Sequence, residues 1–384
     1  MTPAARLGAG IAILDRIAAG EAAEKALTNW ARSSRFAGSK DRAAIRDIVF
    51  DILRTWRSCA VRGGGETGRC LVLGHLRQTG QTPEEFFDGN GYAPTPLTEA
   101  EKHAGAVPEG ADALDLPEWL VARFEASHGA ETPRIANVLR HRAPVFLRVN
   151  LLQSDLQSAQ RDLAVEGIET EPVAGVCTAL KVVHGARGIS RSRAFTSGLV
   201  DLQDAASQAV VLELPLRSAK RVLDYCAGGG GKALAMAALT DAQVEAHDAD
   251  PRRMSDLPSR AARAGARITS VSNPRGTYDL VLCDAPCSGT GAFRRSPEGK
   301  WRLTPQQLAS LLQTQSEILD QASRLVAPGG VLAYATCSIL NEENGAQASG
   351  FLSRMPGWRL TTQKTFLPGD QGDGFFVSCL SRVH

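Results

Sequence analysis

The feature that most constrains the fold is an alternation of short apolar runs with helical stretches in the second half of this 384-residue chain. The apolar runs lie at 221–226, 243–250, 267–272, 279–286, 329–338 and 374–381. Strands that alternate with helices in this way are typical of a parallel, doubly wound sheet. The sequence therefore predicts an α/β domain over residues 201–384.

Two further segments precede this domain. Residues 136–200 pass from strands to a helix and back to strands, which predicts a small α/β subdomain. Residues 1–135 show only helical periodicity and predict an all-helical domain. In one of its helices Ile45, Ile48, Val49 and Ile52 share a stripe, and Asp41 is expected to cap the first turn.

Composition and charge limit the class of protein. No apolar run approaches the roughly 20 residues that cross a bilayer, and the eight cysteines show neither a CxxC pair nor a disulfide framework. We therefore expect a reduced, cytoplasmic protein with free thiols, no membrane partner and no metal. Lys and Arg outnumber Asp and Glu by 12 to 7 in residues 1–70 and by 8 to 5 in residues 136–200. Such basic segments are compatible with phosphate contacts, although a solvated surface gives the same pattern.

Polar side chains end four of the predicted strands. They are Asp224, Asp248, Asp284 and the Thr336-Cys337 pair. Ligands of open α/β sheets bind at the carboxyl ends of the strands. The sequence therefore predicts one site at this edge of the sheet.

A glycine run follows the first of these strands. Gly228 to Gly231 let the backbone approach a ligand closely and open a helix with free N–H groups. A Walker phosphate loop is excluded, because it needs Gly where Cys226 stands and Ser or Thr where Ala233 stands. Asp248 lies where an acid can bind both hydroxyls of a ribose. The alternative for these acids is helix capping or loop solvation.

Two cysteines, Cys287 and Cys337, follow two of the apolar runs. One alternative is that both are buried and inert. A zinc site that adds Cys226 and Cys283 is disfavoured, because it lacks paired short spacings and a nearby histidine.

Four motifs carry a family resemblance: LDYCAGGGGK (223–232), DAPCSGTG (284–291), RRSPEGKW (294–301) and YATCSILNEEN (334–344). In this order and spacing the chain resembles the Sun-type RNA (cytosine-5)-methyltransferases, over about residues 140–384. The helical segment resembles, more loosely, the NusB-like RNA-binding domain of the bacterial members that act on 16S ribosomal RNA. The resemblance implies a Rossmann-like S-adenosylmethionine-dependent domain after the small α/β subdomain and the NusB-like domain.

The resemblance also implies roles for individual residues. Cys337 would attack carbon 6 of the base, Asp284 would contact the base, and Cys287 would assist release. A rival assignment makes Cys287 the nucleophile, because DNA cytosine-5 methyltransferases use a Pro-Cys thiol. The residues implied to hold S-adenosylmethionine are Asp224, Cys226, Ala227, Gly228, Gly229, Gly230, Gly231, Lys232, Asp248, Asn273 and Asp284.

The implied partner is RNA, with 16S ribosomal RNA expected and transfer RNA as the first alternative. Arg294, Arg295, Lys300 and Trp301 follow the second motif and are expected to contact this RNA. A second alternative is a non-catalytic RNA-binding assembly factor. We expect a monomer.

Two positions depart from the family pattern. Gly229 stands where the family usually has Pro, which predicts a looser loop in the free protein. Asn273 stands near the place of the acid that usually ends the third strand. Both departures are expected to weaken binding of the cofactor.

Overall fold

The computed structural model describes residues 1–383, and the chain forms two compact units. The helical unit comprises Met1–Arg142 together with Phe293–Arg302, and the sheet unit comprises the remainder. Residues 293–302, which the sequence places inside the α/β domain, thus belong to the helical unit.

The helical unit packs around one apolar core. Ile45, Val49 and Ile52 of the predicted stripe are fully buried in it, whereas Ile48 is only half-buried at its margin. Its α-helices are α1 (Pro3–Ala18), α2 (Ala23–Ser33), α3 (Ser39–Arg54), α4 (Trp56–Gly63), α5 (Gly68–Gln78), α6 (Glu99–His103), α7 (Gly110–Leu114), α8 (Glu118–His128), α9 (Thr132–Leu139) and α15 (Pro297–Arg302), and its 3₁₀ turns are Pro83–Glu85 and Gly129–Glu131.

One cap differs from the expectation. Gly38, not Asp41, is the N-cap of α3, so the helix begins three residues earlier than expected. Asp41 still serves this helix end from the third helical position, because its carboxylate accepts the backbone N–H of Gly38 at 3.3 Å.

The sheet unit begins with a small antiparallel sheet. Its strands are β1 (Val145–Val149), β2 (Glu169–Val173), β3 (Val176–His184) and β4 (Val200–Leu202), in the spatial order β2-β3-β1-β4. Two helices accompany it, α10 (Leu156–Val165) and α11 (Arg193–Thr196), and a 3₁₀ turn spans Ala186–Arg191.

The large sheet has seven strands in the order β10-β11-β9-β8-β5-β6-β7. They are β5 (Arg221–Asp224), β6 (Gln243–Ala246), β7 (Ile268–Ser270), β8 (Tyr278–Asp284), β9 (Val326–Thr336), β10 (Trp358–Phe366) and β11 (Phe375–Arg382). The pairs among β5 to β9 are parallel, whereas β11 runs antiparallel to β9 and to β10. The sequence predicts the parallel strands and misses β10, whose mostly exposed side chains do not form an apolar run.

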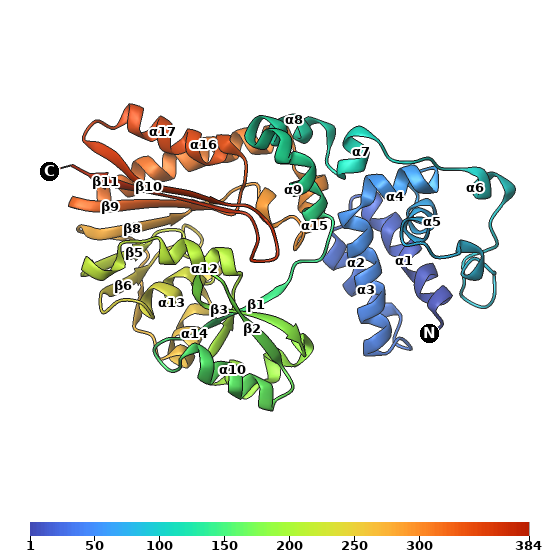
Figure 1. Ribbon diagram of the computed structural model, residues 1–384, viewed down its shortest axis with the longest axis horizontal. Helices are drawn as coiled ribbons and strands as arrows, with labels where there is room; N and C mark the ends of the chain where they lie inside the picture. The colour runs from blue at the N-terminus through green and yellow to red at the C-terminus, as the bar shows by residue number, and fades with distance from the viewer. Residues whose placement is uncertain (384) are drawn as a thin grey trace. The chain divides into compact units, whose positions relative to one another are not determined.

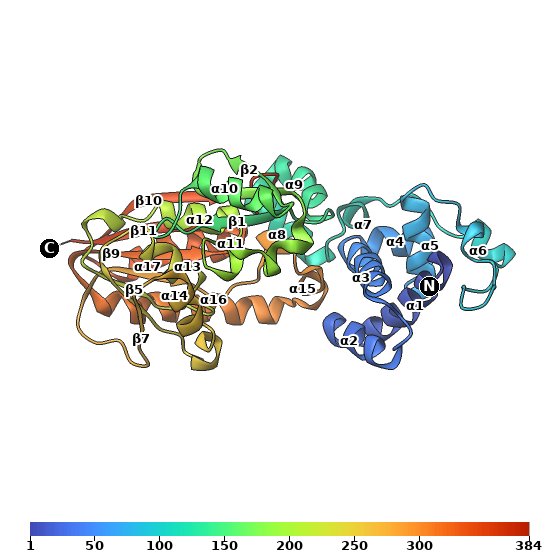
Figure 2. The same cartoon turned by 90° about the horizontal axis from the view of Figure 1, so that it is seen from below.

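Helices cover both faces of this sheet (Figure 1). The helices α12 (Ala205–Leu212), α13 (Gly231–Ala237) and α14 (Leu257–Ala264) lie on one face, and α13 and α14 stand in front of the sheet in Figure 2. The other face holds α16 (Pro305–Ala322) and α17 (Gly345–Arg354). Short 3₁₀ turns lie at Leu216–Ser218, Pro251–Met254, Thr290–Ala292, Ser323–Leu325 and Asn341–Glu343.

Burial on both faces explains why the parallel strands read as continuous apolar runs. On β8, Leu280 and Leu282 pack with α13, whereas Val281 and Cys283 pack with α16. Since β6, β5, β8 and β9 are neighbours, their carboxyl ends lie side by side. None of the helices in residues 1–383 is long and apolar enough to span a bilayer.

Candidate active site at the carboxyl edge of the large sheet

Two thiols meet at the ends of the neighbouring strands β8 and β9. The Sγ atoms of Cys287 and Cys337 lie 3.3 Å apart, and both cysteines are free. The contact with Cys337, together with burial, raises the pKa of Cys287 well above its ordinary value. Cys287 is therefore held as a neutral thiol beside a second sulfur.

A buried carboxylate holds the loops that carry these thiols. Glu343 is fully buried and accepts the backbone N–H of Ser288 at 2.8 Å and the Gln315 amide at 3.0 Å. The hydroxyls of Ser288 and Ser338 also donate to it. Each serine directly follows one of the two cysteines, so Glu343 fixes both loops at once.

Further hydrogen bonds join the two loops directly. The Thr290 hydroxyl contacts that of Ser338 at 2.9 Å and accepts the backbone N–H of Ile339 at 3.0 Å. The N–H of Gly291 donates to the carbonyl of Cys337 at 3.0 Å. The distance between the two thiols is therefore set by a fully bonded scaffold.

Asp284 ends β8 and forms an ion pair. Its Oδ2 lies 2.6 Å from the Nζ of Lys232, which is almost completely buried. Burial by itself lowers the pKa of Lys232, but the adjacent carboxylate of Asp284 outweighs it, and the net pKa is raised. Cys337 is among the groups that act on this charge. The site therefore contains a cation, a carboxylate and two sulfurs.

Asp224, at the end of β5, is fully buried. Neither of its carboxylate oxygens has a hydrogen-bond partner among the described residues. Burial and the nearby charge of Asp284 raise the pKa of Asp224 to about 7. A buried carboxyl without partners has a high free energy unless it is protonated or meets a donor.

The glycine run forms a tight turn before α13. Gly228 and Gly230 have φ values of +51° and +76°, which favour glycine. Asp248 holds this turn, because its carboxylate accepts the N–H of Gly228 at 2.9 Å and also pairs with Arg253 at 3.0 Å. The carbonyl of Gly229 accepts a hydrogen bond from Arg260, which restrains the position where the family usually has Pro.

The other predicted cofactor residues differ in placement. The backbone N–H of Ala227 donates to His247 at 2.8 Å, next to the glycine turn, and burial raises the pKa of Cys226. Asn273 is exposed in a bend beyond β7, and no contact among the described residues ties it to the other site residues. Its role beside the cofactor stays a prediction.

The predicted RNA contacts require a correction. Arg294 is 3% and Lys300 1% exposed inside the helical unit, and Trp301 is half-buried there. Buried side chains cannot reach an RNA phosphate. Arg295 is exposed, and its contact with RNA stays a prediction.

The end of α3 explains this burial. The last carbonyls of a helix lack partners within the helix. Trp301 Nε1 donates to the carbonyl of Leu53 at 2.7 Å, and Lys300 Nζ donates to that of Arg54 at 2.9 Å. Arg54 in turn donates to the carbonyl of Arg294 at 2.8 Å. The motif therefore caps a helix of the helical unit.

Comparisons with known proteins agree with the motifs. Residues 211–381 match the family model of the 16S rRNA methyltransferase RsmB/F, and residues 116–187 match the RsmF/B-like ferredoxin-like domain. The ribosomal RNA small subunit methyltransferase B of Citrobacter koseri is 36% identical over 288 residues, which cover 69% of this chain and 66% of the relative. That of Salmonella arizonae is 35% identical with the same coverage.

This chain belongs to the RsmB/F family. It spans slightly less than two thirds of the length of the relatives that it matches. The ferredoxin-like match contains the strands of the small sheet up to β3.

Solved structures share the fold. The crystal structure of PH0851 has a TM-score of 0.76 at 23% identity and covers 100% of this chain and 99% of that one. A methyltransferase homolog protein from Pyrococcus horikoshii has a TM-score of 0.63 at 22% identity, covering 71% of this chain and 97% of that one. NSun6 from P. horikoshii, solved with SFG, has a TM-score of 0.61 at 18% identity and covers 70% and 98% of the two chains.

Sequence reasoning missed Glu343, whose carboxylate joins both cysteine loops in this RsmB/F chain. The only signal was its place in the quoted motif YATCSILNEEN, five residues after Ser338. Nothing in that spacing shows that its carboxylate reaches both cysteine loops, because the contact requires the turn at Asn341–Glu343.

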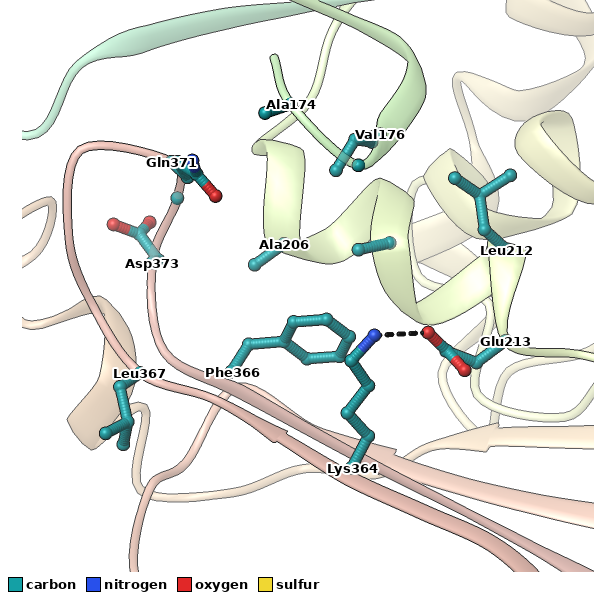
Figure 3. Close-up of a pocket in the computed structure, with 13 residues that line it drawn as sticks. Ala174, Val176, Ala206, Leu212, Glu213, Lys364, Phe366, Leu367, Gln371 and Asp373 are labelled. Carbon is teal, nitrogen blue, oxygen red and sulfur yellow. Dashed lines mark hydrogen bonds and ion pairs between the residues drawn. The ribbon is translucent and has the colours of Figure 1, made fainter.

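A cavity of about 320 Å³ lies elsewhere in the sheet unit (Figure 3). It lies between α12, the end of β10 and the turn at Ala174–Val176, and no predicted catalytic or cofactor residue lines it. Two of its charged groups, Lys364 and Glu213, pair at 2.6 Å. Among residues 1–383 no group of three or more His, Cys, Asp or Glu side chains is arranged to hold a metal ion.

Proposed function

We propose that this chain transfers a methyl group from S-adenosylmethionine to carbon 5 of a cytidine in RNA, with small-subunit ribosomal RNA as the substrate. The observation that carries the proposal is the pair of thiols 3.3 Å apart, next to the Asp284–Lys232 ion pair. The names of the relatives at 35–36% identity support the substrate class.

The thiol pair suits the chemistry of cytosine. Carbon 5 is a poor nucleophile, and addition of the Cys337 thiolate to carbon 6 turns the ring into an enamine whose carbon 5 can attack a methyl group. The positive charge of Lys232, held at Asp284, can balance negative charge that develops on the ring. After methylation the proton on carbon 5 must leave and the bond between sulfur and carbon 6 must break.

In this proposal Cys287 completes that release. Its raised pKa keeps it protonated, and its sulfur lies within reach of the Cys337 sulfur. Cys287 can give its proton to the departing Cys337 thiolate and then take the proton from carbon 5. Both thiols are thereby restored, and the double bond of the base forms again.

The residues at the end of β5 fit the cofactor. S-adenosylmethionine supplies an electrophilic methyl group and carries an ammonium and a sulfonium charge. The Asp224 carboxyl, buried without a partner, can meet such a cation. The Gly228–Gly231 turn opens α13 with free backbone N–H groups, and Asp248 retains lone pairs for ribose hydroxyls.

A methylation assay tests the proposal. The purified protein is incubated with S-adenosylmethionine and either 16S ribosomal RNA or transfer RNA, and 5-methylcytidine is located by bisulfite sequencing. We expect one modified cytidine in the ribosomal RNA and none with Cys337→Ala. If only transfer RNA is modified, transfer RNA and not ribosomal RNA is the substrate. If the protein binds RNA but modifies neither, it is a non-catalytic assembly factor.

A further inference from the structure

The helical unit exposes two aromatic rings that lie against each other. Phe36, between α2 and α3, is 68% exposed, and Tyr92, between α5 and α6, is 81% exposed. Their ring centroids are 6.2 Å apart with an interplanar angle of 18°. The only other large apolar side chain exposed in the described part of this unit is Val107. Two aromatic faces therefore remain open to solvent at one place.

The surrounding backbone fixes this pair. The Tyr92 loop packs directly on α1, because a Cβ at Gly8 would lie only 2.6 Å from the carbonyl of Tyr92. The N–H of Gly89 closes the loop on the carbonyl of Pro94 at 3.0 Å. Beside the rings lies a cavity of about 440 Å³, to which Trp30 contributes a third aromatic side chain. The Tyr92 loop is thus held against α1, and both rings line this cavity.

Cationic residues without a charged partner lie within four positions of Phe36 along the chain. Arg32, Arg35 and Lys40 are exposed, and their side chains have no ion pair or hydrogen bond among the described residues. The acids of this part of the unit already have cationic partners: Glu21 pairs with Arg16, Glu24 with Arg46, and Asp41 with Arg6. Asp88, before the Tyr92 loop, accepts from Asn90. The unpaired charge near Phe36 is therefore cationic.

We propose that Phe36 and Tyr92 form a stacking surface for unpaired bases of the RNA substrate, with Arg32, Arg35 and Lys40 contacting its phosphates. Single-stranded RNA combines planar faces with one negative charge per nucleotide, and stacking on aromatic rings beside a basic surface is how such strands bind. The inference rests on the proposed function. It places the second contact of the RNA on the helical unit, distinct from the base that enters the thiol site.

Substitutions at the rings test the proposal. Phe36→Ala and Tyr92→Ala should each weaken binding of single-stranded ribosomal RNA fragments by about tenfold. Tyr92→Phe should keep wild-type affinity, because the stacking face remains. Val107→Ala is the matched control, since it removes an exposed apolar side chain elsewhere in the unit. Both rings are largely exposed, so circular dichroism and thermal unfolding should match those of the wild type.

Charge substitutions give a second readout. Arg32→Gln with Arg35→Gln should reduce the salt dependence of binding, by a slope of roughly 0.7 for each lost phosphate contact. Arg217→Gln serves as the control, because Arg217 lies in the sheet unit, just before the amino end of β5. If all variants keep the RNA affinity and salt slope of the wild type, the proposal is overturned. The exposed rings would then be a surface for a protein partner.

The outcome is distinguishable from a failure of the proposed function. Val107→Ala should transfer methyl groups at the wild-type rate, whereas the Phe36 and Tyr92 variants should need about tenfold more RNA to reach half of their maximal rate. A wild-type protein that binds the fragments but never methylates RNA would contradict the proposed function, while a tenfold loss in the variants would still support the stacking surface.

Discussion

Asp224 lies at the end of the site that we propose to bind the cofactor. The pKa of Asp224 is raised to about 7. Below this pH the carboxyl is mostly protonated, and a cationic ligand must displace the proton in order to bind. We predict that the Kd for S-adenosylmethionine falls as the pH rises from 5.5 to 8, by up to about tenfold per pH unit below the pKa. Calorimetry at several pH values measures this, and Asp224→Asn should bind weakly with no such dependence. A flat profile in the wild type would contradict the prediction.

The same shift sets the sign of the stability effect without ligand. The unfolded carboxyl has a pKa near 3.9, so between about pH 4 and pH 7 the folded state binds the extra proton. The free energy of unfolding therefore falls as the pH rises from about 4 to about 7, and the contribution of Asp224 is lost above that range. Thermal unfolding of Asp224→Asn should lack this loss.

Glu343 is a positioning residue, because it touches both cysteine loops and neither thiol. In Glu343→Gln the amide nitrogen cannot accept the donors of Ser288, Ser338 and Gln315. We predict a loss of roughly 1–3 kcal/mol in the free energy of unfolding. We also predict a fall in kcat with little change in the KM for S-adenosylmethionine. Glu317→Gln, on the exposed side of α16, is the control. Wild-type kcat in Glu343→Gln would show that the scaffold does not set the thiol geometry.

Among the elements, the end of α3 explains why sequence reasoning misplaced a motif. The pattern RRSPEGKW contains cations and an indole after the DAPCSGTG motif. Such side chains can contact RNA phosphates and bases, and they can equally donate hydrogen bonds to the carbonyls at a helix end. Only the tertiary fold shows that Leu53 and Arg54 accept from Trp301 and Lys300. Residue type alone could not decide between the two partners.

This capping contact has a measurable contribution. We predict that Trp301→Phe lowers the free energy of unfolding by about 1 kcal/mol, because it removes the hydrogen bond to Leu53 and keeps an aromatic ring. Trp30→Phe is the matched control, since no acceptor for the Trp30 indole lies among the described residues. Chemical denaturation compares them, and equal midpoints would show that the cap contributes nothing.

For the whole molecule, the chain enters the helical unit twice. Residues 293–302 return to it six residues after Cys287, and Phe293 is 2% exposed there. We predict that deletion of residues 1–142 alone gives a protein that aggregates or binds S-adenosylmethionine poorly, because apolar side chains lose their core. Deletion combined with a flexible linker in place of 293–302 should restore affinity. Wild-type affinity in the simple deletion would contradict this account.

The sequence predicts the large sheet well because its signals are local. Asp224, Asp284 and Cys337 each end an apolar run, and parallel strands bring such ends together. The presence of β10 was missed because an exposed edge strand lacks an apolar pattern. The antiparallel direction of β11 was missed because an apolar run does not encode the direction of its strand. The role of Glu343 and the burial of Lys300 depend on contacts between distant segments, which no single-sequence pattern encodes.

The central claim is that the paired thiols perform covalent catalysis with divided roles. The direct measurement is a denaturing gel of protein incubated with S-adenosylmethionine and labelled ribosomal RNA. If Cys337 attacks and Cys287 releases, Cys287→Ala should accumulate a protein–RNA adduct that survives denaturation, while Cys337→Ala should form none and be inactive. If Cys337→Ala forms the adduct and Cys287→Ala does not, Cys287 is the nucleophile and Cys337 assists release. If neither variant forms an adduct, the account is contradicted.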